Sequence, residues 1–143
     1  MDDIGVLARS IGGLRLIVVD YFGKILPPPE ARRAGRYEYT TEISGALKNL
    51  ARTLHLPILV LCQLNREVES RKNEPPRLSD LRDSGAIEQD ADAVLLIHKF
   101  TLENENEYDA IPMDLHVAKN RHGKTGKVEF VWYMRNGRML ERR

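Results

Sequence analysis

The strongest constraint on the fold is a pair of short aliphatic runs, residues 16–19 and 58–62, each followed directly by a polar side chain. Aliphatic runs without polar alternation are typical of strands covered on both faces, as in a parallel sheet. Between them, apolar residues recur at three- and four-residue steps from Ile43 to Leu54, and Pro57 marks the end of this helical pattern. A helix between two such strands predicts a right-handed β-α-β unit, and therefore an α/β fold.

The C-terminal third of the chain has a different pattern. A third aliphatic run, residues 93–98, is expected to add a strand to a largely parallel sheet. Beyond it, residues 113–118 and 128–134 are separated by turn-forming residues, which predicts C-terminal antiparallel hairpins. Because no repeat and no boundary interrupts the sequence, we predict that residues 1–143 form a single domain or a large part of one.

Composition narrows the class of protein. Lys and Arg number 22 against 21 Asp and Glu, so any nucleic-acid binding must come from local geometry and not from bulk charge. A single cysteine, Cys62, excludes an internal disulfide framework and fits a reducing compartment. No apolar run approaches the roughly 20 residues of a membrane span, and the acidic N-terminus has no signal-peptide core. We therefore expect a cytoplasmic protein that does not contact a membrane.

The polar residues that end the first two strands are candidates for chemistry. The carboxyl ends of parallel strands are where ligands bind in open α/β sheets. Asp20 is suited to holding Mg²⁺ through water, and the Gln63 amide to donating a hydrogen bond to a γ-phosphate oxygen. Taken alone, the local pattern favours the plainer interpretation, in which Asp20 caps a turn and Gln63 bonds to loop backbone.

Two later segments also carry candidate binding groups. Residues 77–92 gather polar side chains around Gly85, whose backbone N–H can approach an anion closely. Arg82 could contact a phosphate, although the surrounding carboxylates make this stretch a poor general polyanion site. Lys119 and Arg121 lie in a predicted basic hairpin tip, where two cations one residue apart on a strand point the same way. They could reach a phosphate of a neighbouring subunit or belong to a solvated turn.

Taken in order, four segments resemble those of the DnaB family of replicative DNA helicases. Residues 16–21 resemble its Walker B strand, and residues 62–66 its Ser-Gln-Leu-Asn-Arg motif. Residues 79–92 are close to its most diagnostic stretch, and residues 119–126 match its Lys-x-Arg-x-Gly-x-Thr-Gly hairpin. The resemblance covers residues 4–140 and implies a partial RecA-like P-loop ATPase fold, the C-terminal part of the helicase motor domain.

The resemblance also implies roles for individual residues. In the nucleotide site, it implies that Asp20 binds the nucleotide's Mg²⁺ through water and that Gln63 is the γ-phosphate sensor. It implies that Lys119 and Arg121 form the finger that completes the ATP site of the next subunit. Gly23-Lys24 stands where the family usually has Gln-Leu after its Asp-Tyr-Leu, so we expect altered contacts in the loop after Asp20.

For DNA, the resemblance implies that Arg82, Asp83 and the Gly85 backbone contact the phosphates of a single strand. The implied partners are therefore single-stranded DNA, further copies of the chain in a hexameric ring, a primase and a helicase loader. The implied parent activity is ATP-driven translocation on single-stranded DNA with unwinding of the duplex.

One element of the family is missing from the 143 residues. The sequence contains no Gly-x-x-x-x-Gly-Lys-[Ser/Thr] motif, the Walker A loop that cradles the phosphates. ATP and Mg²⁺ are thus cofactors expected of the intact parent and not bound tightly by this chain, which we expect not to hydrolyse ATP alone. The alternative interpretation is a stand-alone remnant that binds DNA or modulates full-length helicase rings without catalysis.

Overall fold

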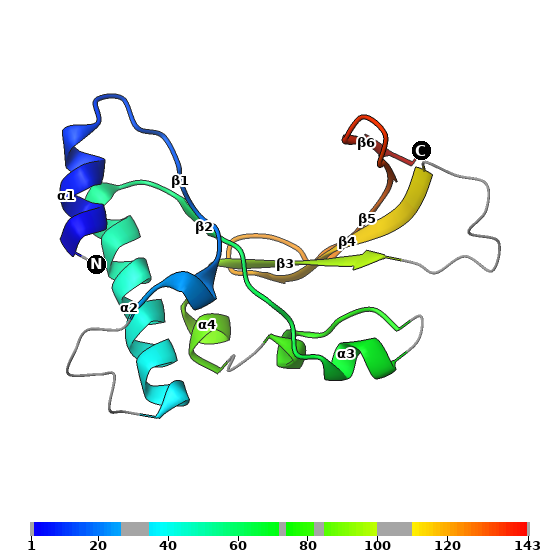
Figure 1. Cartoon of the computed structure of the whole chain (residues 1–143), viewed down its shortest axis with the longest axis horizontal. Helices are drawn as coiled ribbons and strands as arrows, with labels where there is room; N and C mark the ends of the chain where they lie inside the picture. The colour runs from blue at the N-terminus through cyan, green and yellow to red at the C-terminus, as the bar shows by residue number, and fades with distance from the viewer. Residues whose placement is uncertain (1, 27–34, 72–73, 82–84, 100–109, 143) are drawn as a thin grey trace. The chain divides into compact units, whose positions relative to one another are not determined.

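The computed structural model describes residues 2–26, 35–71, 74–81, 85–99 and 110–142 (Figure 1). The contacts of the chain divide it into two compact units. The first comprises Met1–Asn65 with Leu81–Ala91, and the second comprises Arg66–Asp80 with Asp92–Arg143. Within the described segments, no helix is long and apolar enough to cross a membrane.

The first unit is built around a β-α-β arrangement. Its elements are α1 (Asp2–Ser10), β1 (Ile17–Val19), η1 (Phe22–Lys24), α2 (Arg36–Leu54), β2 (Ile58–Val60) and α4 (Gly85–Asp90). Strands β1 and β2 pair in parallel, with Ile17 opposite Ile58 and Val19 opposite Val60 (Figure 1). The parallel pairing and the intervening helix confirm the arrangement predicted from the aliphatic runs.

Helix α2 contributes to the core of the first unit. At its N-terminus the Gly35 N–H donates to Glu38 Oε2 over 2.9 Å, which satisfies one of the amides that a helix start leaves unpaired. Ile43 and Leu47 on α2 are buried, as is Ala86 on α4, against which α2 packs. The apolar spacing of the sequence therefore marks the buried face of this helix.

The second unit is dominated by a four-stranded sheet. Its elements are α3 (Glu67–Ser70), η3 (Leu78–Asp80), β3 (Ala93–Lys99), β4 (Ala110–Asn120), β5 (Gly126–Tyr133) and β6 (Arg138–Glu141). The strands follow one another in the order β3-β4-β5-β6, and every neighbouring pair is antiparallel (Figure 1). The predicted C-terminal antiparallel hairpins are confirmed.

Two details differ from the expectations. Strand β3 belongs to the four-stranded sheet and pairs antiparallel with β4, and not in parallel as expected, because an aliphatic run specifies burial and not the partner strand. The expected cover on both faces of the first two strands is also wrong in part, since Val18 is 54% exposed and Leu59 is 50% exposed. That residues 1–143 form one domain stays a prediction.

Candidate functional site

Asp20 and Gln63 extend from the same edge of the parallel strand pair. Past the ends of β1 and β2, the Leu61 N–H donates to the Val19 carbonyl over 3.0 Å, and the Phe22 N–H donates to the Leu61 carbonyl over 2.8 Å. These bonds hold the two chain segments together next to Asp20 and Gln63 at the C-terminal ends of the strands. Both side chains are exposed, so a carboxylate and an amide are presented to solvent at one edge.

The turn after Asp20 is shaped by Tyr21. A Cβ atom at Gly23 would lie 2.8 Å from Tyr21 Cε2, too close for a real contact, so this position is restricted to glycine while the ring stays in place. Lys24 Nζ lies 5.9 Å from the centre of the same ring, within range of a cation–π contact. The tyrosine ring therefore crowds position 23 in the turn after Asp20.

The segment after Gln63 and the segment before Arg82 meet at a backbone bridge. Leu64, directly after Gln63, forms an isolated antiparallel β-bridge with Leu81, directly before Arg82. Leu81 is 5% exposed, so the bridge is anchored in the core of the first unit. Gly85 is the first residue of helix α4, which follows the loop in the sequence. The predicted contacts Arg82 and Asp83 themselves lie outside the described residues.

The segment that leads into the loop is fixed by a buried carboxylate. Asp80 accepts a hydrogen bond of 2.6 Å from the Arg77 N–H and forms an ion pair with the Arg71 guanidinium. The hydrogen bond from Arg71 is the main cause that holds the pKa of Asp80 below its ordinary value. From the sequence, Asp80 is expected in a turn-like restart at residues 79–81 and among the carboxylates around Arg82, without a partner of its own. Its position three residues after Arg77 is the available signal, because an acidic side chain there can accept from the N–H at the start of a helical turn.

The basic hairpin predicted around Lys119 and Arg121 is the connection between β4 and β5. Lys119 lies on β4 opposite Val94, where a bulge interrupts the pairing with β3. Arg121 lies one residue beyond the end of β4, in the turn, so the two cations do not share a regular strand. The Arg121 N–H donates to the Asp92 carbonyl over 2.7 Å, and its Nη1 lies 3.2 Å from Asp92 Oδ1. Asp92 is thus a partner that the sequence interpretation missed.

The tip of this hairpin is closed by Asn120. Its amide nitrogen donates to the Lys124 carbonyl over 3.3 Å, and its amide oxygen accepts from the His122 N–H over 3.2 Å. A Cβ atom at Gly123 would lie 2.7 Å from the same amide nitrogen, so the close approach requires glycine there. The motif residues of the hairpin therefore shape the turn that presents Arg121.

The fold is that of a RecA-like helicase ATPase domain. A solved ATPase domain superposes with a TM-score of 0.83 at 29% identity, covering 99% of this chain and 50% of that chain. The structure of a DnaB-like replicative helicase, solved in a study of its interactions with primase, superposes with a TM-score of 0.73 at 30% identity. This match covers 90% of the present chain and 30% of the helicase chain.

The sequence comparison gives the family. Residues 2–140 match the DnaB-like helicase C terminal domain, and the chain belongs to this family. It is 41% identical over 123 residues to the replicative DNA helicase DnaB of Mycoplasma pneumoniae, a match that covers 82% of this chain. The chain spans about a quarter of the length of the curated relatives it matches.

Proposed function

We propose that this chain forms part of the motor of a replicative DNA helicase, which uses ATP to translocate on single-stranded DNA and separate the duplex. Within that motor, Asp20 orients the water shell of Mg²⁺, and the Gln63 amide donates to the γ-phosphate. The exposed carboxylate and amide at one edge of the strand pair fit a hydrated cation beside a phosphate. Bound MgATP would supply the free energy of each step.

The observation that carries this proposal is the bridge between Leu64 and Leu81. It joins the residue after the γ-phosphate sensor to the residue before the DNA loop, through backbone atoms anchored by a buried leucine. A displacement of Gln63 on loss of the γ-phosphate would therefore be passed directly to the loop that holds DNA. The backbone link gives the coupling a physical route, which is what a translocating motor requires.

On the DNA side, we propose that Arg82 and the Gly85 backbone contact phosphates of the single strand. Asp83 then orients the arginine or the loop amides. The loop begins beside the Asp80 network, whose contacts with Arg71 and Arg77 hold the chain before the loop in one conformation. Phosphate contacts of this kind position the protein on the strand without reading its sequence.

We further propose that Lys119 and Arg121 reach the ATP of the next subunit. Arg121 pairs with Asp92 inside its own chain, and both side chains are about half exposed, so exchanging this partner for a phosphate costs little. A finger supplied from a neighbouring subunit is worth roughly 10³–10⁵ in rate. It implies a closed head-to-tail ring, which is a hexamer in this family.

The proposed partners follow from the family. The similarity to a replicative helicase solved for its interactions with primase supports a primase as one partner, and a helicase loader is a second. ATP and Mg²⁺ belong to the intact motor. Because the 143 residues contain no Walker A motif, we expect the chain by itself neither to bind ATP tightly nor to hydrolyse it.

Single-stranded DNA binding by the full 143-residue chain tests the proposal. Fluorescence anisotropy with a labelled oligonucleotide across a salt series should give weaker binding for Arg82→Ala than for wild type. The slope of log K against log salt should fall by about 0.7 for one lost phosphate contact. Arg52→Ala removes the same charge from an exposed position near the end of α2 and is expected to leave affinity and slope unchanged. Equal losses in both variants would refute a specific DNA loop.

The second candidate function is a module that joins full-length rings without catalysis, with the half-exposed Arg121 available to a neighbouring subunit. Adding the chain to a full-length DnaB-type helicase distinguishes the two. A non-catalytic module should enter the rings and change their ATPase rate, and Arg121→Ala should alter that change. If the chain stays apart from the rings at every ratio in size-exclusion chromatography, the module is excluded.

A further inference from the structure

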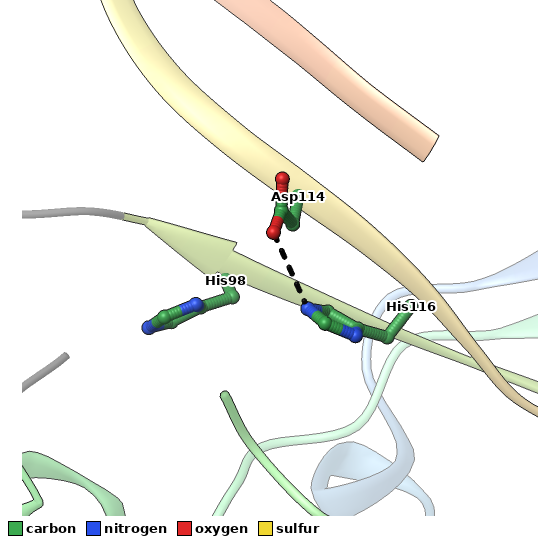
Figure 2. A group of neighbouring side chains, drawn as sticks. All are labelled: His98, Asp114 and His116. Carbon is green, nitrogen blue, oxygen red and sulfur yellow. Dashed lines mark ion pairs between the residues drawn. The ribbon is translucent and has the colours of Figure 1, made fainter. Parts of the chain in front are cut away.

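Three side chains that the helicase function does not use gather on one face of the antiparallel sheet: His98, Asp114 and His116 (Figure 2). His98 on β3 lies directly opposite Asp114 on β4. His116 follows Asp114 by two residues, so all three side chains project from the same face. The two imidazole rings lie 6.3 Å apart between centroids.

The cluster is buried and one of its polar atoms is left unsatisfied. His98 is 8% exposed and Asp114 is 4% exposed. His116 Nε2 is inaccessible to solvent and has no hydrogen-bond partner within the described part of the chain, and it lies 3.7 Å from Asp114 Oδ2 (Figure 2). Leaving a buried nitrogen unpaired is unfavourable, and native proteins satisfy the great majority of such groups.

We propose that His98, Asp114 and His116 bind a divalent transition-metal ion, with Zn²⁺ as the ion that best matches the ligands. One nitrogen from each imidazole and one carboxylate oxygen lie within 4.8 Å of one another. Tetrahedral Zn²⁺ with bonds of about 2.0–2.1 Å spaces its ligand atoms about 3.4 Å apart. Small side-chain rotations close this difference, because the two strands already hold the three groups on one face.

The chemistry of the ligands selects the class of ion. Two imidazole nitrogens with one carboxylate favour Zn²⁺ and its first-row neighbours over Mg²⁺ and Ca²⁺, which prefer oxygen ligands. The bound ion would link β3 to β4.

Lys127 is the competitor for this site. Its Nζ lies 3.2 Å from Asp114 Oδ2 and 2.8 Å from Glu129 Oε1. A metal ion would displace the lysine from Asp114, and Glu129 would keep it paired. The competition makes a specific prediction: removing the lysine charge should tighten metal binding, whereas a site that Zn²⁺ does not use would be indifferent to it.

The proposal is independent of the helicase function and is tested by metal titration of the full chain after treatment with a chelator. Calorimetry with Zn²⁺ should show one ion per chain, and His116→Gln should weaken the affinity at least tenfold. His122→Gln is the matched control, since His122 is exposed in the hairpin turn and should leave the affinity unchanged. Lys127→Met should bind Zn²⁺ more tightly than wild type.

Three results would overturn the proposal. The first is the absence of Zn²⁺ binding, and the second is equal binding by wild type and His116→Gln. The third is a Co²⁺ complex whose spectrum shows a thiolate charge-transfer band, because such a band would assign the ion to Cys62. His98 is buried and its substitution could unfold the sheet, so the decisive variant is His116→Gln at the more accessible position. Its melting temperature without metal should stay close to that of wild type, and Zn²⁺ should raise only the wild-type melting temperature.

Discussion

The parallel strand pair and the antiparallel sheet differ in where they place their polar side chains. In the parallel pair, Asp20 and Gln63 are exposed at the strand ends, and Val18 and Leu59 are exposed on one face. In the antiparallel sheet, the carboxylate of Asp114 is buried between cross-strand partners.

This difference distinguishes residues that solvent can reach from residues that stabilise the fold. Groups at the exposed strand ends, such as Asp20 and Gln63, can be reached from solution and contribute little to the stability of the fold. Groups that hold a strand register are buried, and each unmade contact costs free energy. Stability should therefore be sensitive to substitution in the antiparallel sheet and insensitive at the exposed edge of the parallel pair.

The largest expected effect comes from a matched pair of leucines. Leu96 on β3 is 3% exposed and Leu59 on β2 is 50% exposed. Leu96→Ala should lower the free energy of unfolding by about 2–5 kcal/mol, because it leaves a cavity in the buried face of the sheet. Leu59→Ala should cost less than about 1.5 kcal/mol, since half of that side chain already contacts water. Urea unfolding followed by circular dichroism, and by fluorescence of the single tryptophan, Trp132, measures both. Equal losses would mean that the contrast between the two regions is wrong.

Two aspartates, Asp80 buried and Asp20 exposed, test through the pH dependence of stability whether buried polar groups contribute more than exposed ones. The pKa of Asp80 is lowered on folding, so its ionised form stabilises the protein above the unfolded pKa of about 3.9. That contribution is lost as the pH falls through the lower pKa of the folded state. Asp80→Asn should therefore lower the urea midpoint near pH 7, and the gap from wild type should narrow below about pH 4. Asp20→Asn, at the exposed strand end, should leave the midpoint unchanged at pH 7. A gap for Asp80→Asn that stays constant down to pH 2 would contradict the role of Arg71.

A pair of serines sharpens the contrast inside the first unit. Ser44 on α2 is buried and donates to Asp90 Oδ2 of α4 over 2.7 Å, whereas Ser10 donates to the Leu7 carbonyl at the exposed end of α1. Ser44→Ala should cost about 1 kcal/mol, because Asp90 loses a partner in a partly buried place. Ser10→Ala should change stability by less than about 0.5 kcal/mol. Urea titrations at one pH compare them, and equal costs would show that α4 does not depend on this bond.

The sequence predicts the secondary-structure elements, but it does not predict which strands pair with one another. The aliphatic runs, the helical spacing from Ile43 to Leu54 and the polar residues Asp20 and Gln63 are local patterns, and the structure has the corresponding elements in these places. The pairing of β3 with β4 could not be derived, because it depends on a register that contains a bulge between Val94 and Leu95.

The same reason explains the residues that were missed. His98 and Asp114 are 16 positions apart in sequence and become neighbours only through that register. The available signal was local: polar residues at 114 and 116 alternate with apolar ones along a strand, which marks a polar row on one face. Asp92 gave no comparable signal as the partner of Arg121, because their contact depends on where the hairpin turn folds back.

The smallest expected effect concerns the link between Arg121 and Asp92, and it is the most informative for function. Both side chains are about half exposed, so their coupling in a double-mutant cycle should be below about 1 kcal/mol. A weak pair lets the guanidinium exchange its carboxylate for a phosphate, while the bond from the Arg121 N–H to the Asp92 carbonyl still fixes the turn. Arg121→Lys keeps the positive charge and is the control for the loss of charge in Arg121→Ala. Urea titration of wild type, Arg121→Ala, Asp92→Ala and the double variant gives the coupling directly. A coupling of several kcal/mol would mean that Arg121 is committed to its own chain, and the proposed finger would have to be Lys119 alone.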